Sequence, residues 1–415
     1  MKKTVRYIIE FLIGTPEYAD MIGYTGDVSL WSKYKVVIVP SYFFNDGVFG
    51  TKNSMPKLPL QEINEIPLLY GEPVITKQND IVILKADIIA SSFFLLTRYE
   101  ETINKKRDIH GRFTGKDSLP YRAGFIDRCV VDEYGELLRS CLNLAGVEVK
   151  NLDQKFSCVM THDADKIEQY QNLRGFVGGL IHNHFKDAFV SLFGGIEKDL
   201  LYTFPWMKSI ESELPNLSSK VFIRVPNNTS IFDKPYYSLS SNGIKRLFEL
   251  YPNYGLHISY EAGLNPELIA DEKQKLELAG ACKITECRNH YLASREPEDM
   301  MALVNCGITD DYTMGYADVA GFRLGTCKPV KWINPRTCYL TTLSLHSLVV
   351  MDCTLDRTEY MNLNYDDAYK CCLKLINIVR RHNGEWVGLW HNSSVSVLSG
   401  GYQRELFKSI IQSLA

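Results

Sequence analysis

Several features that would place this chain in a familiar class are missing from its sequence. No stretch approaches the ~20 uninterrupted apolar residues of a membrane-spanning helix. No long run of lysine and arginine is present, and the formal net charge of the 415 residues is −3, which supplies no field for capturing nucleic acid. The chain also contains no short internal repeat and no low-complexity tract. We therefore expect a globular protein with no transmembrane segment and no nucleic-acid partner.

The sequence also lacks signs of an oxidising compartment. Its 11 cysteines are odd in number and irregularly spaced, and none forms a CxxC pair, so reduced thiols are expected. Residues 1–10 resemble a signal peptide only faintly, because Arg6 and Glu10 interrupt the apolar stretch and no small-residue cleavage site follows. We interpret residues 1–10 as a first β-strand and expect the protein to be cytoplasmic.

What the sequence does contain is an ordinary globular composition arranged in alternating strand-like and helix-like segments. Residues 1–150 are predicted to form a small α/β domain of unknown role, with strands at 34–40 and 81–84 and a helix at 87–101. A fresh strand near residue 150 then starts a second domain, predicted to span residues 151–415.

Two polar or irregular segments interrupt this alternation. Residues 105–122 are expected to form an ordered loop, with His110 as a surface residue. Residues 169–213 contain helix-like pieces with one aromatic face, and we favour a lid or channel insertion over an interfacial membrane helix because basic residues are few. That face consists of Phe185, Phe189, Leu192 and Phe193.

In the second domain, ionisable residues fall where predicted strands end. They are Asp163 and Asp165, His257, Arg288 and His290, and His391. The strand-then-helix rhythm recurs about seven times, which favours an α/β barrel in which the carboxyl ends of parallel strands meet at one face. Asp163 and Asp165 are two positions apart and point to the same side of their strand, so they form either a metal site or a pair sharing one proton.

This set of residue types suits metal-assisted hydrolysis. A carboxylate with two imidazoles, leaving positions open for water, is a standard catalytic arrangement for zinc or a similar divalent ion. Such an ion acidifies water and polarises a carbonyl group. A second carboxylate can act as the base, an arginine can orient that base, and a distal histidine can protonate the leaving amine.

The order of these motifs resembles the polysaccharide deacetylase superfamily, which includes the nodulation and chitin N-deacetylases, and is closest to a bacterial branch with an extra N-terminal domain of unassigned function. The matching runs are residues 161–165 (THDAD), 255–260 (GLHISY), 288–292 (RNHYL), 389–392 (LWHN), 314–318 (MGYAD), 321–327 (GFRLGTC) and 351–355 (MDCTL). Upstream, residues 91–101 and 121–125 resemble the N-terminal domain of that branch. The resemblance implies a distorted (β/α)7 barrel, a divalent metal, most simply zinc, and hydrolysis of an acetyl group on a sugar.

The resemblance also implies roles for individual residues. Asp163 would be the general base, Arg288 the arginine that orients it, His391 the general acid, and Asp165 and His257 metal ligands. Better-studied members supply a second histidine four residues after the first, where this chain has Glu261. The third ligand is therefore open between His290, Glu261 and water, and we favour His290 because it shares a strand end with Arg288. His162 points to the opposite face and is expected to be structural.

Two functions remain to be weighed. The first is metal-dependent removal of an N-acetyl or O-acetyl group from a sugar in surface-polysaccharide or glycoconjugate biosynthesis, with an acetylated sugar or glycan intermediate as substrate. The second is a catalytically inactive barrel that binds glycans or acts as a scaffold, suggested by the missing second histidine. We favour the enzyme because Asp163 and His391 supply a base and an acid, which a binding module does not need.

Overall fold

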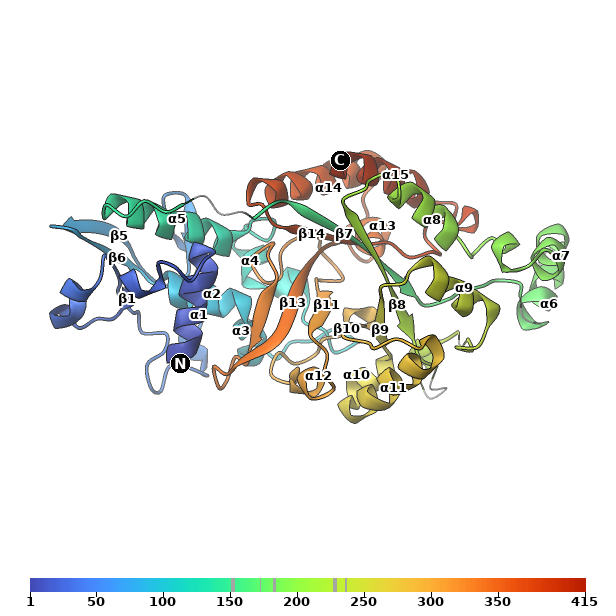
Figure 1. Cartoon of the computed structure of the whole chain (residues 1–415), viewed down its shortest axis with the longest axis horizontal. Coiled ribbons are helices and arrows are strands. Elements are labelled where there is room, and N and C mark those ends of the chain that lie inside the picture. The colour runs from blue at the N-terminus through green and yellow to red at the C-terminus, as the bar shows by residue number, and fades with distance from the viewer. Residues whose placement is uncertain (151–153, 172, 182–183, 227–229, 236) are drawn as a thin grey trace.

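A computed structural model of the chain describes residues 1–415 except 151–153, 172, 182–183, 227–229 and 236. Figure 1 shows two sheets that follow each other along the long axis, the N-terminal one at the left and a barrel in the centre.

The predicted distorted (β/α)7 barrel is confirmed. Seven parallel strands lie in the order β11-β10-β9-β8-β7-β14-β13, and β11 pairs with β13 to close the ring. An eighth strand, β12 (Val330–Ile333), pairs antiparallel with β13 outside the ring. The ring strands are β7 (Ser157–Ala164), β8 (Leu217–Arg224), β9 (Tyr254–Ile258), β10 (Glu286–Asn289), β11 (Asp310–Met314), β13 (Leu340–Met351) and β14 (Glu385–Leu389).

Helices follow most of the ring strands and cover the barrel, as in other parallel barrels. The exception is β11, after which the chain runs through a loop into β12. The helices are α8 (Phe204–Glu211), α9 (Asn242–Leu250), α10 (Tyr260–Leu264), α11 (Ile269–Gly280), α12 (Met301–Asn305), α13 (Asp352–Asp356), α14 (Tyr365–Arg381) and α15 (Gln403–Leu414).

The N-terminal part is built on a four-stranded sheet with the order β1-β2-β6-β5, in which only β5 is antiparallel to its neighbour. Its strands are β1 (Ile22–Tyr24), β2 (Val36–Ile38), β5 (Gly71–Gln78) and β6 (Ile81–Ala86), and β3 (Gln61–Ile63) and β4 (Ile66–Leu68) form a separate pair. Its helices are α1 (Lys2–Ile13), α2 (Ile88–Leu96), α3 (Tyr99–Ile103), α4 (Leu119–Arg122) and α5 (Val130–Leu144).

The expected first strand at residues 1–10 is wrong, because this stretch lies within helix α1. Thr4, Ile8 and Leu12 recur every four residues and are buried on one face, which is the helical period. Arg6 and Glu10, which interrupt the apolar run, form an i,i+4 ion pair with an N–O distance of 2.8 Å. The interruption of the apolar run therefore marks the polar face of a helix.

The N-terminal part and the barrel share one hydrophobic core. A single cluster of buried side chains runs from α1 and the first sheet into the barrel. Backbone groups also bond across the junction: the Thr4 hydroxyl donates to the Cys338 carbonyl at 2.5 Å, and the Lys331 amide donates to the Tyr7 hydroxyl at 2.6 Å. The predicted boundary at residue 151 lies outside the described residues, and a division at that point stays a prediction.

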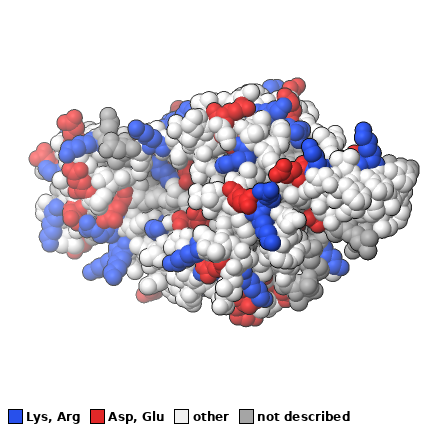
Figure 2. Space-filling model, turned by 45° about the vertical axis from the view of Figure 1, so that its right-hand side comes forward, with Lys and Arg blue, Asp and Glu red and all other residues white. Residues whose placement is uncertain are grey.

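The predicted excursion after β7, residues 169–213, contains α6 (Leu173–Ile181) and α7 (Phe185–Gly194), which project from the barrel at the right of Figure 1, as well as α8. The aromatic face of α7 is exposed to solvent: Phe185 is 51%, Phe189 47% and Phe193 77% exposed. Figure 2 shows the lobe at this end carrying few charges, whereas both signs are interspersed over the rest of that view. None of the helices in the described parts of the chain is long and apolar enough to cross a membrane.

Candidate active site

Strand register brings the ionisable residues to one face of the barrel. His257 on β9 lies level with Arg224 at the end of β8 and with Arg288 on β10. Asp163 and Asp165 stand at the end of β7, between these strands and β14. All the carboxyl ends point the same way because the seven strands are parallel.

Asp165, His257 and His290 converge on one point. Each offers a ligand atom, and these atoms lie within 4.8 Å of one another. The Asp165 Oδ1 atom is 3.2 Å from His257 Nε2 and 3.3 Å from His290 Nε2. Carboxylate oxygen and imidazole nitrogen are ligand types that zinc and similar divalent ions accept.

The hydrogen bonds behind the two imidazoles fix which nitrogen faces Asp165. His257 Nδ1 donates to the Arg288 carbonyl at 3.1 Å, and His290 Nδ1 donates to Asp233 Oδ1 at 2.9 Å. Both Nε2 atoms then present lone pairs to a carboxylate oxygen, and burial lowers the pKa of His290, which disfavours its doubly protonated form.

A cation fits this arrangement. Within the part of the chain that the structure describes, the buried atoms Asp165 Oδ1 and His257 Nε2 have no hydrogen-bond partner. Acceptors that face each other across about 3 Å without a donor between them repel unless a positive charge lies among them. The residues present therefore suit a divalent metal ion.

Asp163 lies beside this cluster and is held by Arg288. The Arg288 Nη1 atom donates to Asp163 Oδ1 at 3.0 Å, and Arg288 Nε donates to the Tyr312 carbonyl at 3.0 Å. The guanidinium also stacks over the Phe222 ring, 4.7 Å from its centroid. The second Asp163 oxygen is 3.6 Å from His257 Nε2, so one carboxylate oxygen is oriented by Arg288 while the other faces the cluster.

His391 approaches the cluster from the other side of β7. Its Nε2 atom is 3.7 Å from Asp165 Oδ2. His391 therefore lies next to the group of three ligand atoms without belonging to it. Its Nδ1 atom bonds Asp352 Oδ1 at 2.8 Å, and its backbone amide donates to Asp352 Oδ2 at 2.8 Å. Burial alone would lower the pKa of His391, but the charge of Asp352 and the Cys353 thiol raise it well above its usual value.

Asp165 has the opposite shift. Burial alone would raise the pKa of this carboxyl, but the surrounding imidazoles, His290 foremost, hold it well below its usual range. Asp165 is therefore an ionised carboxylate in the folded protein and remains available as an anionic ligand.

Asp233 and Arg224 support the cluster from the loop and strand beside it. Asp233 ends the short 3-10 helix Ile231–Asp233, and besides His290 it accepts from the Tyr260 amide at 2.8 Å. Arg224 donates through Nη2 to the Asp165 carbonyl at 3.0 Å. A carboxylate behind a ligating histidine fixes the ring orientation and raises the basicity of the other nitrogen.

The mouth of the site is formed partly by residues from outside the barrel. The His110 ring lies 4.6 Å from the ring of Tyr291, and Arg112 Nη1 donates to the Tyr291 carbonyl at 2.9 Å. Tyr291 and Leu292 have left-handed φ values of 61° and 54°, which cost energy for residues with side chains. His110, expected on the surface of a loop, instead packs half-buried against this strained turn.

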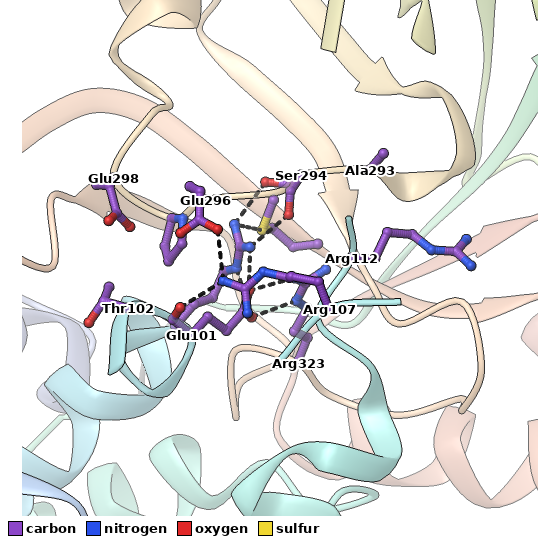
Figure 3. Close-up of polar contacts among 12 residues, drawn as sticks. Glu101, Thr102, Arg107, Arg112, Ala293, Ser294, Glu296, Glu298 and Arg323 are labelled. Carbon is purple, nitrogen blue, oxygen red and sulfur yellow. Dashed lines mark hydrogen bonds and ion pairs between the residues drawn. The ribbon is translucent and has the colours of Figure 1, made fainter. Parts of the chain in front are cut away.

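Residues 98–101, just upstream of segment 105–122, are anchored to the barrel by a buried group of hydrogen bonds and ion pairs (Figure 3). Arg98 donates to the Ser294 hydroxyl at 2.8 Å and to the Ser294 carbonyl at 2.9 Å. Glu101 accepts from Arg323 at 2.9 and 3.0 Å, and also from Arg98. Burial would raise the pKa of Glu101, but Arg323 and Arg98 lower it to about 2. The loop that follows His290 is thereby tied to α3.

A cavity of about 210 Å³ opens onto the clustered residues. Asp163, Asp165, His290 and His391 lie in its wall together with Arg112 from the N-terminal part. The cavity gives a small polar group direct access to both Asp163 and His391.

The structure brings together all six residues singled out in the sequence. Glu261, the other ligand candidate, instead accepts a hydrogen bond from Asn265 at 2.7 Å and is not in the convergent group. His162 lies away from the cluster, as expected, with its ring bonded to the Trp390 carbonyl at 2.8 Å and to Glu211 at 2.5 Å.

Sequence reasoning did not assign a role to Asp233 or Asp352. Asp352 directly follows β13, so the rule that polar residues at strand ends meet at one face could have included it. Asp233 lies in a loop nine residues beyond β8, where no periodic pattern marks it.

The fold and this face define a closed seven-stranded parallel α/β barrel with a carboxylate–histidine cluster at the carboxyl ends of its strands. Residues 4–146 match a family model described as a family of unknown function (DUF7033). A search of curated proteins found no match. Among solved structures, a provisionally assigned polysaccharide deacetylase from Mycobacterium smegmatis is similar, with 15% identity and a TM-score of 0.40 over 64% of this chain and 87% of that one. This likeness is distant, so the interpretation of the site rests on the residues described above.

Proposed function

We propose that this protein is a metal-dependent hydrolase that removes an acetyl group from a sugar in surface-polysaccharide or glycoconjugate biosynthesis. The observation that carries the proposal is the set of facing acceptors on Asp165, His257 and His290, flanked by an oriented carboxylate and an oriented imidazole. A divalent ion, most simply zinc, would be held by these three residues and would supply Lewis-acid polarisation and water activation.

The remaining residues take up the proton transfers. Asp163, held by Arg288, is placed to accept a proton from the attacking water. His391, held by Asp352, presents Nε2 to the cavity, and as the imidazolium it donates a proton to the departing amine or alcohol. Amines leave poorly unless protonated, which is why the acid and the base occupy separate positions beside the same carbonyl group.

The same geometry favours an enzyme over the alternative of an inactive glycan-binding barrel. Binding alone would be served by polar and aromatic groups, without an arginine that orients one carboxylate and a carboxylate that orients one imidazole. Asp163 and His391 lie in the wall of one cavity, and Arg288 and Asp352 hold them from behind at 3.0 Å and 2.8 Å. They support hydrolysis over binding.

The test combines metal analysis with acetate release. Protein purified without chelator should contain about one divalent ion per chain and should release acetate from members of a panel of N- and O-acetylated sugars and their phosphate esters. Chelation should abolish release and zinc should restore it. Absence of both metal and acetate release would favour the inactive barrel.

Two variants separate the proposed roles. Asp163→Asn should lower acetate release ~10²–10⁴-fold with metal content unchanged, because the shape is kept and the proton acceptor is lost. His391→Ala should likewise retain metal and fold while losing most of the activity. Loss of metal in Asp163→Asn would mean that the two aspartates have exchanged roles, and undiminished activity in His391→Ala would refute the acid assignment.

A further inference from the structure

The wall of the active-site cavity carries more positive charge than hydrolysis of a neutral acetylated sugar requires. Three basic residues line it, Arg112, Lys234 and Arg357, and each comes from a different stretch of the chain. Among the described residues of this wall, the carboxylates are only Asp163 and Asp165. Asp163 is paired with Arg288, and Asp165 faces the proposed cation.

The three basic residues differ in how far their charges are already neutralised. Arg112 is paired with Asp108 at 2.7 Å and also donates to the Tyr360 hydroxyl at 3.2 Å. Arg357 is half exposed, with Glu359 3.9 Å away. Lys234 is exposed and, among the described residues, has no carboxylate within 4.0 Å.

Lys234 and Arg357, the exposed basic residues of the lining, form what we call the rim and are weakly compensated cations, whereas Arg112 is already engaged by Asp108 and Tyr360. Cations that converge on a cleft attract an anionic ligand and raise its local concentration. A neutral sugar could accept hydrogen bonds from them but would not be attracted by their charge, whereas an anion gains both.

We propose that the sugar substrate carries a phosphate group, which binds at the rim between Lys234 and Arg357 while the acetyl group reaches Asp163 and His391. This inference rests on the proposed function, since it concerns the substrate of the same cavity. A phosphate fits better than a carboxylate because it has more oxygens to share among donors from separate elements, and arginine and lysine are the side chains that bind it best.

The test compares a phosphorylated with an unphosphorylated sugar on the zinc-loaded full chain. Calorimetric titration should show tighter binding of N-acetylglucosamine 1-phosphate than of N-acetylglucosamine. Lys234→Gln and Arg357→Gln should each reduce this preference about three- to tenfold, the range for one partly exposed charge-assisted contact. Metal content should stay at the wild-type value in both variants, which separates rim binding from binding to the ion.

Matched controls use two exposed basic residues of α14 that do not line the cavity. Lys370→Gln and Arg381→Gln change the net charge equally and should leave the preference unchanged. Equal wild-type affinity for the two sugars, or a preference that survives both rim substitutions, would overturn the inference. Tighter binding of an N-acetylated uronic acid than of the sugar phosphate would overturn the choice of phosphate.

Acetate release distinguishes failure of this inference from failure of the proposed function. A phosphate preference without acetate release from any sugar would refute the hydrolase and leave the anion site standing. Equal release from phosphorylated and unphosphorylated sugars would refute the anion site and leave the hydrolase standing.

Discussion

Single residues at this site act largely by holding other residues. Arg288 holds Asp163, Asp352 holds His391, and Asp233 holds His290, with donor–acceptor distances of 3.0, 2.8 and 2.9 Å. Each of these supporting contacts selects one orientation of a side chain that has several in solution. Pre-ordering of this kind is what separates a convergent cluster from a set of nearby polar groups.

Substitution of Asp233 tests whether one supporting residue controls the metal affinity of the site. Asp233→Asn keeps an oxygen for the Tyr260 amide but removes the charge that orients His290 and makes it more basic. We expect zinc affinity, measured by competition with a chelating dye, to fall about 10–100-fold. Unchanged affinity would show that His290 is not a ligand.

Asp318→Asn is the matched control. Asp318 is also buried and also accepts from two backbone amides, those of Gly115 and Lys116, at 2.7 and 3.1 Å. Asp318 is not in the convergent group. The control should therefore leave zinc affinity unchanged, and an equal fall in both variants would mean that loop packing controls the metal site.

The sequence allowed the proposed ligands and proton-transfer groups to be predicted but not all of their supports. His257 and Asp165 follow apolar strand segments, and parallel topology alone brings such positions together. Asp233 reaches His290 across 57 residues of chain, through a loop whose path no periodic pattern specifies. The contact of Arg112 with Tyr291 spans 179 residues and was equally inaccessible.

At the level of elements, one histidine connects several strands at the amino ends of the barrel strands, opposite the candidate active site. His346 on β13 bonds Asp310 at the start of β11 at 3.0 Å and Glu385 at the start of β14 at 2.6 Å. Its ring stacks on Tyr312 with a centroid distance of 4.1 Å. Burial would lower the pKa of His346, but the two carboxylates raise it to about 9. His346 thus links three neighbouring strands as a cation.

This contact should make stability depend on pH. Because the folded pKa of His346 is about 9 and the unfolded value is 6.5, its contribution is fully present below pH 6.5 and is lost as pH rises through 9. We expect His346→Gln to lower the free energy of unfolding by about 3 kcal/mol at pH 6. The difference from wild type should shrink by pH 9.5 in urea titrations.

The exposed His184 supplies the comparison. His184→Gln should alter stability by less than about 0.5 kcal/mol at either pH, as most surface substitutions do. A destabilisation by His346→Gln that does not change with pH would mean that shape and packing at this position matter, and charge does not.

Prediction at the level of elements failed where one apolar pattern fits two structures. Residues 2–13 carry apolar pairs with polar interruptions, which alone do not distinguish a short strand from a helix. The i,i+4 recurrence of the buried residues identifies a helix only once the surface that they pack against, on α5, is known. Ring strands such as β7 and β8 were predicted more securely because an apolar run in each leads into a polar or charged residue.

In the whole molecule, buried contacts join the N-terminal part to the barrel. Removing residues 1–153 would leave Arg323 buried without Glu101, and would strip Ser294 and Cys338 of their partners. An unpaired buried charge alone costs ~3–5 kcal/mol, a large share of the stability of a typical protein. Residues 154–415 expressed alone should therefore be insoluble or lack a cooperative unfolding transition by circular dichroism.

Co-expression of residues 1–150 is the control for this prediction. It should restore soluble protein that copurifies as a pair, since the shared core and the buried ion pairs can form between separate chains. A soluble, cooperatively unfolding fragment 154–415 would show that the barrel is an independent domain.

The contribution of segment 105–122 to the cavity wall has a consequence for how such proteins diverge. Arg112 belongs to a stretch of the gene upstream of every ring strand, whereas Asp163, His257 and His391 are encoded with the barrel. Mutation or recombination in the upstream stretch would alter what the cavity admits while the proposed ligands and proton-transfer residues stay as they are. If the proposed function holds, descendants of one ancestor could in this way acquire different substrates with the reacting groups unchanged.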